Sequence, residues 1–231
     1  MNNKYLIIIP AFNEEANILH LLADIKKCGD SYIPLVIDDG SSDQTYELAR
    51  KEARTLRHPV NLGIGATIQT GLLYAKNNNF DFCLQVDGDG QHPPEEIIKL
   101  INKQIETKAN LVIGSRFIDN QGYRSTSSRR LGISILKITL NSFSITKISD
   151  PTSGFRLFDR KAIELFSEFY PYDYPEPISI SYGISRGLTV NEVSVLMRAR
   201  MGGKSSIYGI GNLKYMIKTT MSILLMKILR P

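Results

Sequence analysis

The sequence predicts an α/β protein whose mostly parallel sheet is flanked by helices. Short apolar runs, among them residues 5–9, 33–37 and 82–86, have the composition of strands buried on both faces. Longer segments such as residues 16–27 place apolar side chains at the 3.6-residue spacing of an amphipathic helix. Strands and helices that alternate in this way are typical of parallel α/β sheets.

The first half of the chain is expected to alternate strictly between strand and helix. Asn13 suits the N-cap of the first helix, and Glu14 and Glu15 suit its first turn. Pro93 and Pro94 suit the start of the fourth helix, where a proline loses no hydrogen bond. In chain order we expect strands at residues 5–9, 33–37, 57–60, 82–86 and 110–114, and helices at residues 16–27, 44–54, 63–76 and 94–107.

The pattern becomes less regular after residue 116. Residues 118–130 are polar and basic and are expected to form a mobile loop over the site. The further elements are expected to be helices at 131–145, 160–169 and 178–185, strands within 150–158 and at 188–196, a proline- and tyrosine-rich loop at 170–177 and a basic loop at 198–206. Residues 207–230 carry apolar residues at helical spacing among basic ones, which predicts an amphipathic helix.

Composition narrows the possible partners. At 231 residues and 42% hydrophobic content, the chain can form one α/β domain with a real core. A net charge of +5 suits nucleotide phosphates, lipid phosphates or an anionic membrane surface, but it is too small to indicate nucleic-acid binding. Cys28 and Cys83 are too few for a disulfide framework or a zinc site, so a cytoplasmic location is expected. Neither a signal segment nor an apolar run long enough for a transmembrane helix is indicated.

The segment Asp87-Gly88-Asp89-Gly90 follows an apolar strand and carries two carboxylates separated by one glycine. Both can turn toward one point, and glycine leaves room for a bulky ligand to approach. Hard oxygen ligands of this kind suit Mg²⁺ or Mn²⁺ bound together with substrate phosphates. Gln91 and His92 could complete the ligand set, although a lone histidine more often has a structural partner. The alternative is an ordinary Asp-Gly turn between strand and helix.

Polar clusters follow four of the predicted strands. Ligands of open α/β sheets bind at the carboxyl ends of the strands, so clusters gathered at that edge favour a binding site over isolated turns. The clusters are Asn13 with Glu14, Asp38 with Asp39, Asp87 with Asp89, and Ser115 with Arg116.

Seven motifs in order resemble those of the glycosyltransferase family 2 proteins. They are Ile-Pro-Ala-Phe-Asn-Glu-Glu at 9–15, Ile-Asp-Asp-Gly-Ser-Ser-Asp at 37–43, Asn-Leu-Gly-Ile-Gly at 61–65, Val-Asp-Gly-Asp-Gly-Gln-His-Pro at 86–93, Gly-Ser-Arg-Phe at 114–117, Asp-Pro-Thr-Ser-Gly-Phe-Arg at 150–156 and Arg-Met-Gly-Gly-Lys-Ser-Ser at 200–206. The resemblance implies a Rossmann-like GT-A catalytic domain at residues 1–206, followed by a C-terminal amphipathic helix at 207–231. It is strongest to the polyprenyl-phosphate and dolichyl-phosphate sugar transferases, although the Ser-Lys that ends their basic loop reads Ser205-Ser206 here, with the lysine displaced to Lys204.

The resemblance also implies a set of donor-binding residues for a nucleotide-sugar, UDP- or GDP-linked. Phe12 stands where many relatives carry tyrosine, which leaves the base open. A divalent cation, Mg²⁺ or Mn²⁺, is implied at Asp87, Asp89 and Gln91. The implied donor site comprises Pro10, Phe12, Glu14, Ile37, Asp38, Asp39, Gly65, Asp87, Gly88, Asp89, Arg116, Arg200 and Lys204.

For catalysis, the resemblance implies inversion by in-line attack of an acceptor oxygen on the anomeric carbon. Arg116, Arg200 and Lys204 can neutralise the departing diphosphate, although loop arginines are often only solvated surface charges. A hydroxyl acceptor needs a general base, for which Asp150 and Glu176 are the two candidates. A lipid phosphate is already an anion and needs none, and Asp150 could equally cap the following turn.

The expected function is transfer of a sugar from a nucleotide to a polyprenyl phosphate or lipid-linked glycan, in cell-surface polysaccharide synthesis. The C-terminal helix could place the protein at the inner face of the membrane, or could contact the catalytic domain, a second subunit or a membrane-protein partner. One alternative is a glycosyltransferase with a soluble or polysaccharide hydroxyl acceptor. Others are a nucleotidyltransferase, which also uses paired carboxylates, and a non-catalytic subunit that binds nucleotide-sugar.

Overall fold

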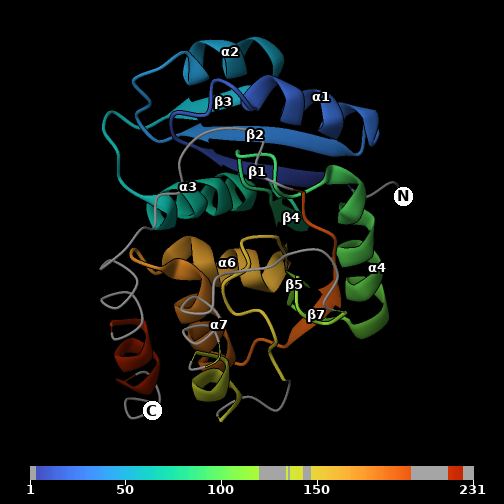
Figure 1. The fold of residues 1–231 in the computed structure, drawn as a ribbon, viewed down its shortest axis with the longest axis vertical. Coiled ribbons are helices and arrows are strands. Elements are labelled where there is room, and N and C mark those ends of the chain that lie inside the picture. The colour runs from blue at the N-terminus through green and yellow to red at the C-terminus, as the bar shows by residue number, and fades with distance from the viewer. Residues whose placement is uncertain (1–3, 120–133, 135, 143–146, 199–217, 226–231) are drawn as a thin grey trace.

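A seven-stranded mixed sheet organises the protein (Figure 1). The structure is a computed structural model that describes residues 4–119, 134, 136–142, 147–198 and 218–225. The strands stand in the order β3-β2-β1-β4-β6-β5-β7, which places β4 at the centre. Their bounds are β1 Tyr5–Ala11, β2 Tyr32–Asp38, β3 Arg54–Arg57, β4 Phe82–Gln85, β5 Leu111–Ser115, β6 Arg156–Asp159 and β7 Val190–Ser194.

Helices cover both faces of this sheet. The apolar residues of β1 alternate between the two faces: Leu6 and Ile8 belong to one core cluster, and Ile7 and Ile9 belong to the other. Helices α3, α6 and α7 supply the first cluster, while α1, α2 and α4 supply the second. The helices are α1 Ile18–Lys27, α2 Thr45–Glu52, α3 Ile64–Asn77, α4 Ile97–Thr107 preceded by the 3-10 turn Pro94–Glu96, α6 Arg160–Glu168 and α7 Pro175–Ser185.

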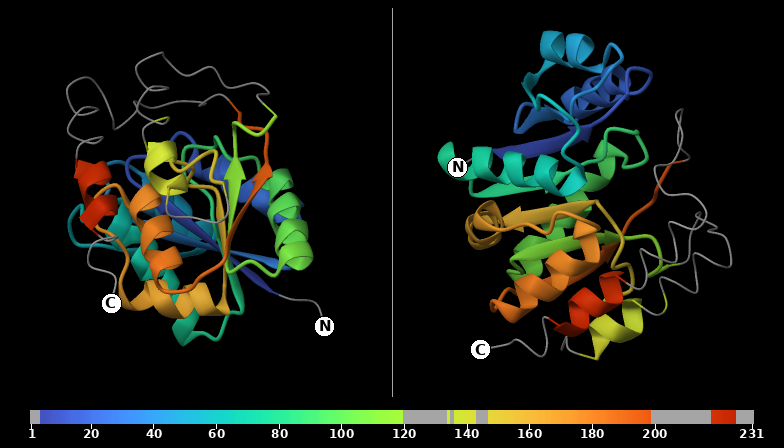
Figure 2. Two further views of the ribbon diagram at one scale, coloured as in Figure 1. Left: turned by 90° about the horizontal axis from the view of Figure 1, so that it is seen from below. Right: turned by 90° about the vertical axis from the view of Figure 1, so that its left-hand side faces the viewer.

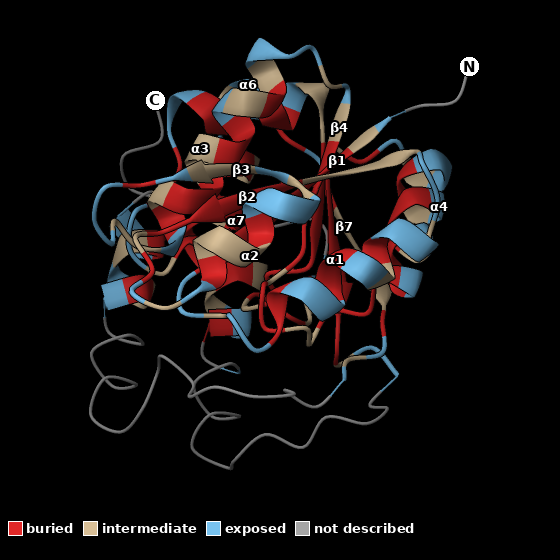
Figure 3. Cartoon of the chain, turned by 90° about the horizontal axis from the view of Figure 1, so that it is seen from above, coloured by how far each residue is buried: buried red, intermediate tan, exposed pale blue. Residues whose placement is uncertain are grey.

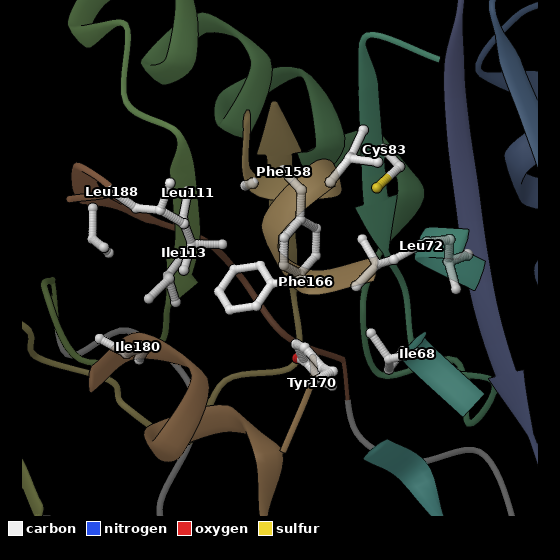
Figure 4. Close-up of a cluster of buried hydrophobic side chains, with 14 of the residues drawn as sticks. Ile68, Leu72, Cys83, Leu111, Ile113, Phe158, Phe166, Tyr170, Ile180 and Leu188 are labelled. Carbon is white, nitrogen blue, oxygen red and sulfur yellow. The ribbon is translucent and has the colours of Figure 1, made fainter. Parts of the chain in front are cut away.

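The first cluster is centred on aromatic rings. Phe166 of α6 lies edge-on to Phe158 of β6, with ring centroids 5.9 Å apart, and edge-on to Tyr170, at 5.4 Å (Figure 4). Ile68 and Leu72 of α3 line the same cluster. Buried residues fill the interior, and exposed ones lie on the outer faces of the helices (Figure 3). The sheet is therefore covered on both sides, as its apolar strands predict.

The direction of the strands fixes where functional side chains gather. β1 is parallel to β2 and β4, whereas β6 runs antiparallel to both β4 and β5. Because two antiparallel steps restore the direction, β5 points the same way as β4. The carboxyl ends of β1, β2, β4 and β5 thus meet at one edge, which confirms the expected gathering of the four polar clusters.

Several predicted boundaries were wrong. The third strand lies at Arg54–Arg57 rather than 57–60, because pairing with β2 begins soon after α2 ends, and Val60 is exposed. Helix α7 begins at Pro175, so the expected loop at 170–177 includes its first turn, where proline loses no hydrogen bond. Asn13 does not cap α1, which begins at Ile18; its side chain instead accepts a hydrogen bond from the Ser42 amide.

Two further helical segments, within residues 134–142 and at 218–225, lie at the same end of the molecule as α7 (Figure 2). The second belongs to the expected C-terminal helix, whose other residues lie outside the described ranges. Ile223 is buried there, whereas Met221, Leu224 and Leu225 are exposed. Within the described residues, none of the helices has the length and apolar character needed to cross a membrane.

Candidate active site

The turn after β4 lies directly against the end of β1. The amide of Gly88 donates to the carbonyl oxygen of Pro10 at 3.3 Å. A Cβ atom at position 88 would stand only 2.8 Å from that oxygen. Glycine is therefore required for this close approach, and it brings Asp87 and Asp89 to the sheet edge beside Pro10.

Neighbouring groups hold Asp87 in place. Gln85 Nε2 donates to Asp87 Oδ1 at 3.1 Å, and the Asp87 amide donates to His92 Nδ1 at 3.1 Å. The buried His92 ring stacks on Phe155 with centroids 5.0 Å apart. A Cβ atom at Gly154 would stand 2.8 Å from Asp87 Oδ2, so glycine reserves the space for the carboxylate. His92 thus has a structural partner, which favours a supporting role over one as a metal ligand.

The residues at this turn fit a divalent cation. Asp89 is 8% exposed, and its Oδ1 accepts from the Gln91 amide at 3.0 Å. Within the described residues, His, Cys, Asp and Glu side chains do not gather in a group of three or more that could hold a metal. Asp87 and Asp89 alone match an ion that takes one or two carboxylates and completes its shell with phosphate oxygens and water.

Asp38 and Asp39 are both buried and both paired within the protein. Asp39 accepts from the Leu62 and Gly63 amides at 2.9 and 2.8 Å, and its Oδ1 lies 2.7 Å from His58 Nδ1. Asp38 Oδ2 lies 3.1 Å from Arg57 Nε. The carboxylate of Asp39 therefore anchors the loop that leads into α3, whatever contact it makes with a ligand.

The other residues expected in the nucleoside pocket lie at the ends of β1 and β2. Phe12 is 45% exposed just beyond β1. The amide of Glu14 donates to Thr45 Oγ1 at 2.7 Å, and its carboxylate accepts from Asn17 Nδ2. Ile37 is fully buried in a core cluster, so its side chain stabilises the fold rather than facing solvent at the edge.

Gly65 lies where helix α3 closely approaches the loop before α7. A Cβ atom at this position would stand 2.2 Å from the carbonyl oxygen of Pro171 and 2.4 Å from that of Tyr172. The first turn of α3 therefore touches the backbone of the loop that leads into α7. Glycine is needed here because neither partner is a flexible side chain.

We expect Gly65→Ala to destabilise the protein by about 1–3 kcal/mol, because overpacking against backbone forces both segments apart. A loss of stability would be informative, because replacing glycine by alanine in a helix ordinarily raises the free energy of unfolding by about 1 kcal/mol. Urea denaturation of this variant measures the effect, with Ile64→Ala at the preceding exposed position as the control. A Gly65→Ala protein as stable as the unaltered one would contradict the contact.

Arg116 and Asp150 form a buried bidentate ion pair. Arg116 Nε and Nη2 donate to Asp150 Oδ2 and Oδ1 at 2.6 and 2.7 Å, and the Arg116 amide donates to Oδ2 as well. Thr152 Oγ1 accepts a further bond from Nη2 at 2.8 Å. Asp150 is fully buried, and these contacts fix the orientation of Arg116.

Glu176 stands in the first turn of α7, close to a buried arginine. Arg156 is fully buried and donates to the carbonyl oxygens of Ser153 and Glu176 and to Ser179 Oγ, at 2.7 to 2.8 Å. Although Glu176 is partly exposed as a residue, desolvation of its carboxyl group raises its pKa. Arg156 opposes this rise, and the negative charge of Asp87 adds to it. A raised pKa near a second carboxylate suits a group that takes up a proton.

Arg200 and Lys204 lie outside the described residues. The segment before them is tied to the Asp87–Asp89 side of the sheet: the Arg198 amide donates to the Gln91 carbonyl oxygen at 3.0 Å, and the Arg198 guanidinium pairs with Asp24 and Glu95. Sequence reasoning missed the supporting roles of Gln85 and Arg156. A polar residue inside an otherwise buried strand was the available signal for both.

Fold and site together define a class of protein. A mostly parallel α/β sheet with two carboxylates at the carboxyl end of its central strand is typical of an enzyme that binds a phosphorylated nucleotide with a divalent ion. Within that class, the chain belongs to glycosyl transferase family 2, whose model matches residues 6–166. It is therefore a glycosyltransferase with the GT-A fold.

Named relatives share much of the chain. A UDP-N-acetylglucosamine–dolichyl-phosphate N-acetylglucosaminyltransferase of Methanococcus voltae is 28% identical over 70% of this chain and 72% of its own length. The polyprenol monophosphomannose synthase of Mycolicibacterium smegmatis is 29% identical over 89% of this chain and 82% of its own length. The chain spans 66% to 82% of the length of three curated relatives.

A solved structure confirms the fold. Glucosyl-3-phosphoglycerate synthase from Mycobacterium tuberculosis, in complex with Mn²⁺, uridine-diphosphate and phosphoglyceric acid, matches with a TM-score of 0.72. The match covers 99% of this chain and 80% of that one at 20% identity. The described part of this chain therefore has the same fold as that enzyme.

Proposed function

We propose that the protein is an inverting, metal-dependent glycosyltransferase that moves a sugar from a UDP-sugar to a polyprenyl phosphate. The observation that carries the proposal is the Asp87–Asp89 turn at the carboxyl edge of the central strand, in a chain of family 2. The names of two relatives include a dolichyl phosphate and a polyprenol, which supports the lipid acceptor. Uridine-diphosphate and Mn²⁺ in the matching solved structure support the donor class.

In the proposed reaction, an oxygen of the acceptor phosphate attacks the anomeric carbon. The bond from that carbon to the diphosphate oxygen breaks, and UDP leaves with the electron pair. Asp87 and Asp89 would hold the Mg²⁺ or Mn²⁺ that stabilises the charge on the departing diphosphate. Arg116, held in a fixed orientation by Asp150, would face the same charge.

The acceptor phosphate needs no general base, because it is already ionised. Glu176 then has no proton to accept, although desolvation raises the pKa of its carboxyl group. A hydroxyl acceptor would instead require Glu176 to accept its proton. Exposed apolar residues on the two helical segments near α7, including Ile138 and Leu225, offer a surface for a membrane or lipid chain.

Transfer to lipid is the test of this acceptor. We expect the full-length protein with Mn²⁺ and a panel of UDP-sugars to form a solvent-extractable glycolipid from polyprenyl phosphate, with one UDP released per sugar moved. Polyprenol without the phosphate is the matched control and should give no product. Transfer to phosphoglyceric acid or a polysaccharide, with none to polyprenyl phosphate, would overturn the lipid acceptor. Pyrophosphate release from a nucleoside triphosphate would indicate a nucleotidyltransferase instead.

A further inference from the structure

Glu192, on the edge strand β7, satisfies three donors of a single turn. Its Oε2 accepts from the amide and the hydroxyl of Ser149, both at 2.7 Å. Its Oε1 accepts from the amide of Asp150 at 2.8 Å. Both carboxylate oxygens are thus committed to the two residues that precede Pro151.

The same turn holds Arg116 from the other side. The Asp150 carboxylate accepts two hydrogen bonds from the guanidinium of Arg116 and a third from the Arg116 amide. The hydroxyl groups of Ser149 and Ser115 lie 2.7 Å apart, which ties the turn to the end of β5 just before Arg116. A continuous chain of contacts therefore runs from Glu192 through Ser149 and Asp150 to Arg116.

We propose that Glu192 is a positioning residue that sets the orientation of Arg116 through Ser149 and Asp150. The proposal rests on the function proposed above, in which Arg116 faces the diphosphate. Three features support it: the register that places Glu192 beside Ile113 of β5, the fully buried Asp150, and an Arg116 that is only 9% exposed. With so little room to move, the guanidinium takes its direction from the turn.

A carboxylate is the appropriate group at this position. It accepts from several donors at once, and a carboxamide of the same size would present an NH₂ group to donors that already point at it. Burial raises the pKa of Glu192, while the bonds from Ser149 and Asp150 oppose the rise. Those bonds therefore favour the ionised form that can accept from all three donors.

The test measures two quantities for each variant: the affinity for UDP in the presence of Mn²⁺, by calorimetry, and the KM for the UDP-sugar. We expect Glu192→Gln to weaken both by about tenfold, as is typical when a supporting partner of a ligand-binding group is lost. Ser149→Ala keeps the carboxylate and removes one hydroxyl, so it should fold and should weaken both by a smaller factor. Glu164→Gln, the same change at an exposed site on α6, should leave both unchanged.

The energetic coupling between the two substitutions distinguishes a positioning role from general damage to the fold. If the residues act as one chain, the Ser149→Ala and Glu192→Gln double variant should bind UDP about as weakly as Glu192→Gln alone. Independent losses that multiply in the double variant would overturn the proposal. The proposal would also be overturned if Glu192→Gln or Ser149→Ala bound UDP with an affinity within about twofold of that of Glu164→Gln. Lack of UDP binding by the unaltered protein would overturn the proposed function, and this inference with it.

Discussion

Asp89→Ala is expected to lose about a thousandfold in kcat/KM for sugar transfer. A bound metal contributes several kcal/mol of charge stabilisation in the transition state, and each 1.36 kcal/mol corresponds to a factor of ten. If Asp87 and Asp89 hold the ion as proposed, the loss of one of these two carboxylates removes a large share of the affinity for the metal.

The measurement is steady-state UDP release over a range of Mn²⁺ concentrations. Asp81→Ala, at the exposed opposite end of β4, is the matched control and should behave like the unaltered protein. If Asp89→Ala kept its activity at every Mn²⁺ concentration, Asp87-Gly88-Asp89 would be an ordinary turn and the metal site would be excluded there.

Asp150→Ala is expected to lower the free energy of unfolding by about 3–5 kcal/mol, because it leaves the charge of Arg116 buried without its partner. The turn would also lose its bonds to the Arg116 amide and to Thr152. UDP affinity should fall together with stability, since Arg116 would lose its orientation.

Chemical denaturation measures the free energy of unfolding, and Asp81→Ala again serves as the exposed control.

Glu176→Gln, at the other candidate base, is compared with Asp150→Ala to establish the role of Asp150. Glu176→Gln should fold normally, because Arg156 contacts the Glu176 carbonyl oxygen, which the substitution leaves in place. An Asp150→Asn protein with unchanged stability and UDP affinity but no turnover would instead identify Asp150 as a general base.

The order of most elements could be predicted because the long helices have a clear hydrophobic period and strands such as β1 and β2 are continuous apolar runs. The antiparallel insertion of β6 between β4 and β5 could not, because a four-residue strand has no periodicity that reveals its direction. The third strand was misplaced for a related reason: Arg54–Arg57 is a polar edge strand, and its position depends on pairing with β2.

For the site, the sequence located the carboxylates but not their partners. Asp150 and Glu176 are alike as candidate bases in sequence, and only the ion pair with Arg116 separates them. Gly65 stays a predicted donor contact, and the structure adds its close approach to the backbone atoms of residues 171 and 172. Both roles depend on segments far apart in the chain, which spacing along the sequence cannot bring together.

Calorimetric titration with UDP, GDP, CDP and dTDP, each with and without Mn²⁺, tests the central claim most directly. We predict that UDP binds when Mn²⁺ is present, binds far more weakly without it, and binds more tightly than the other three diphosphates. Binding of none of the four, or binding that is equally tight without metal, would contradict a metal-dependent nucleotide-sugar site at Asp87 and Asp89.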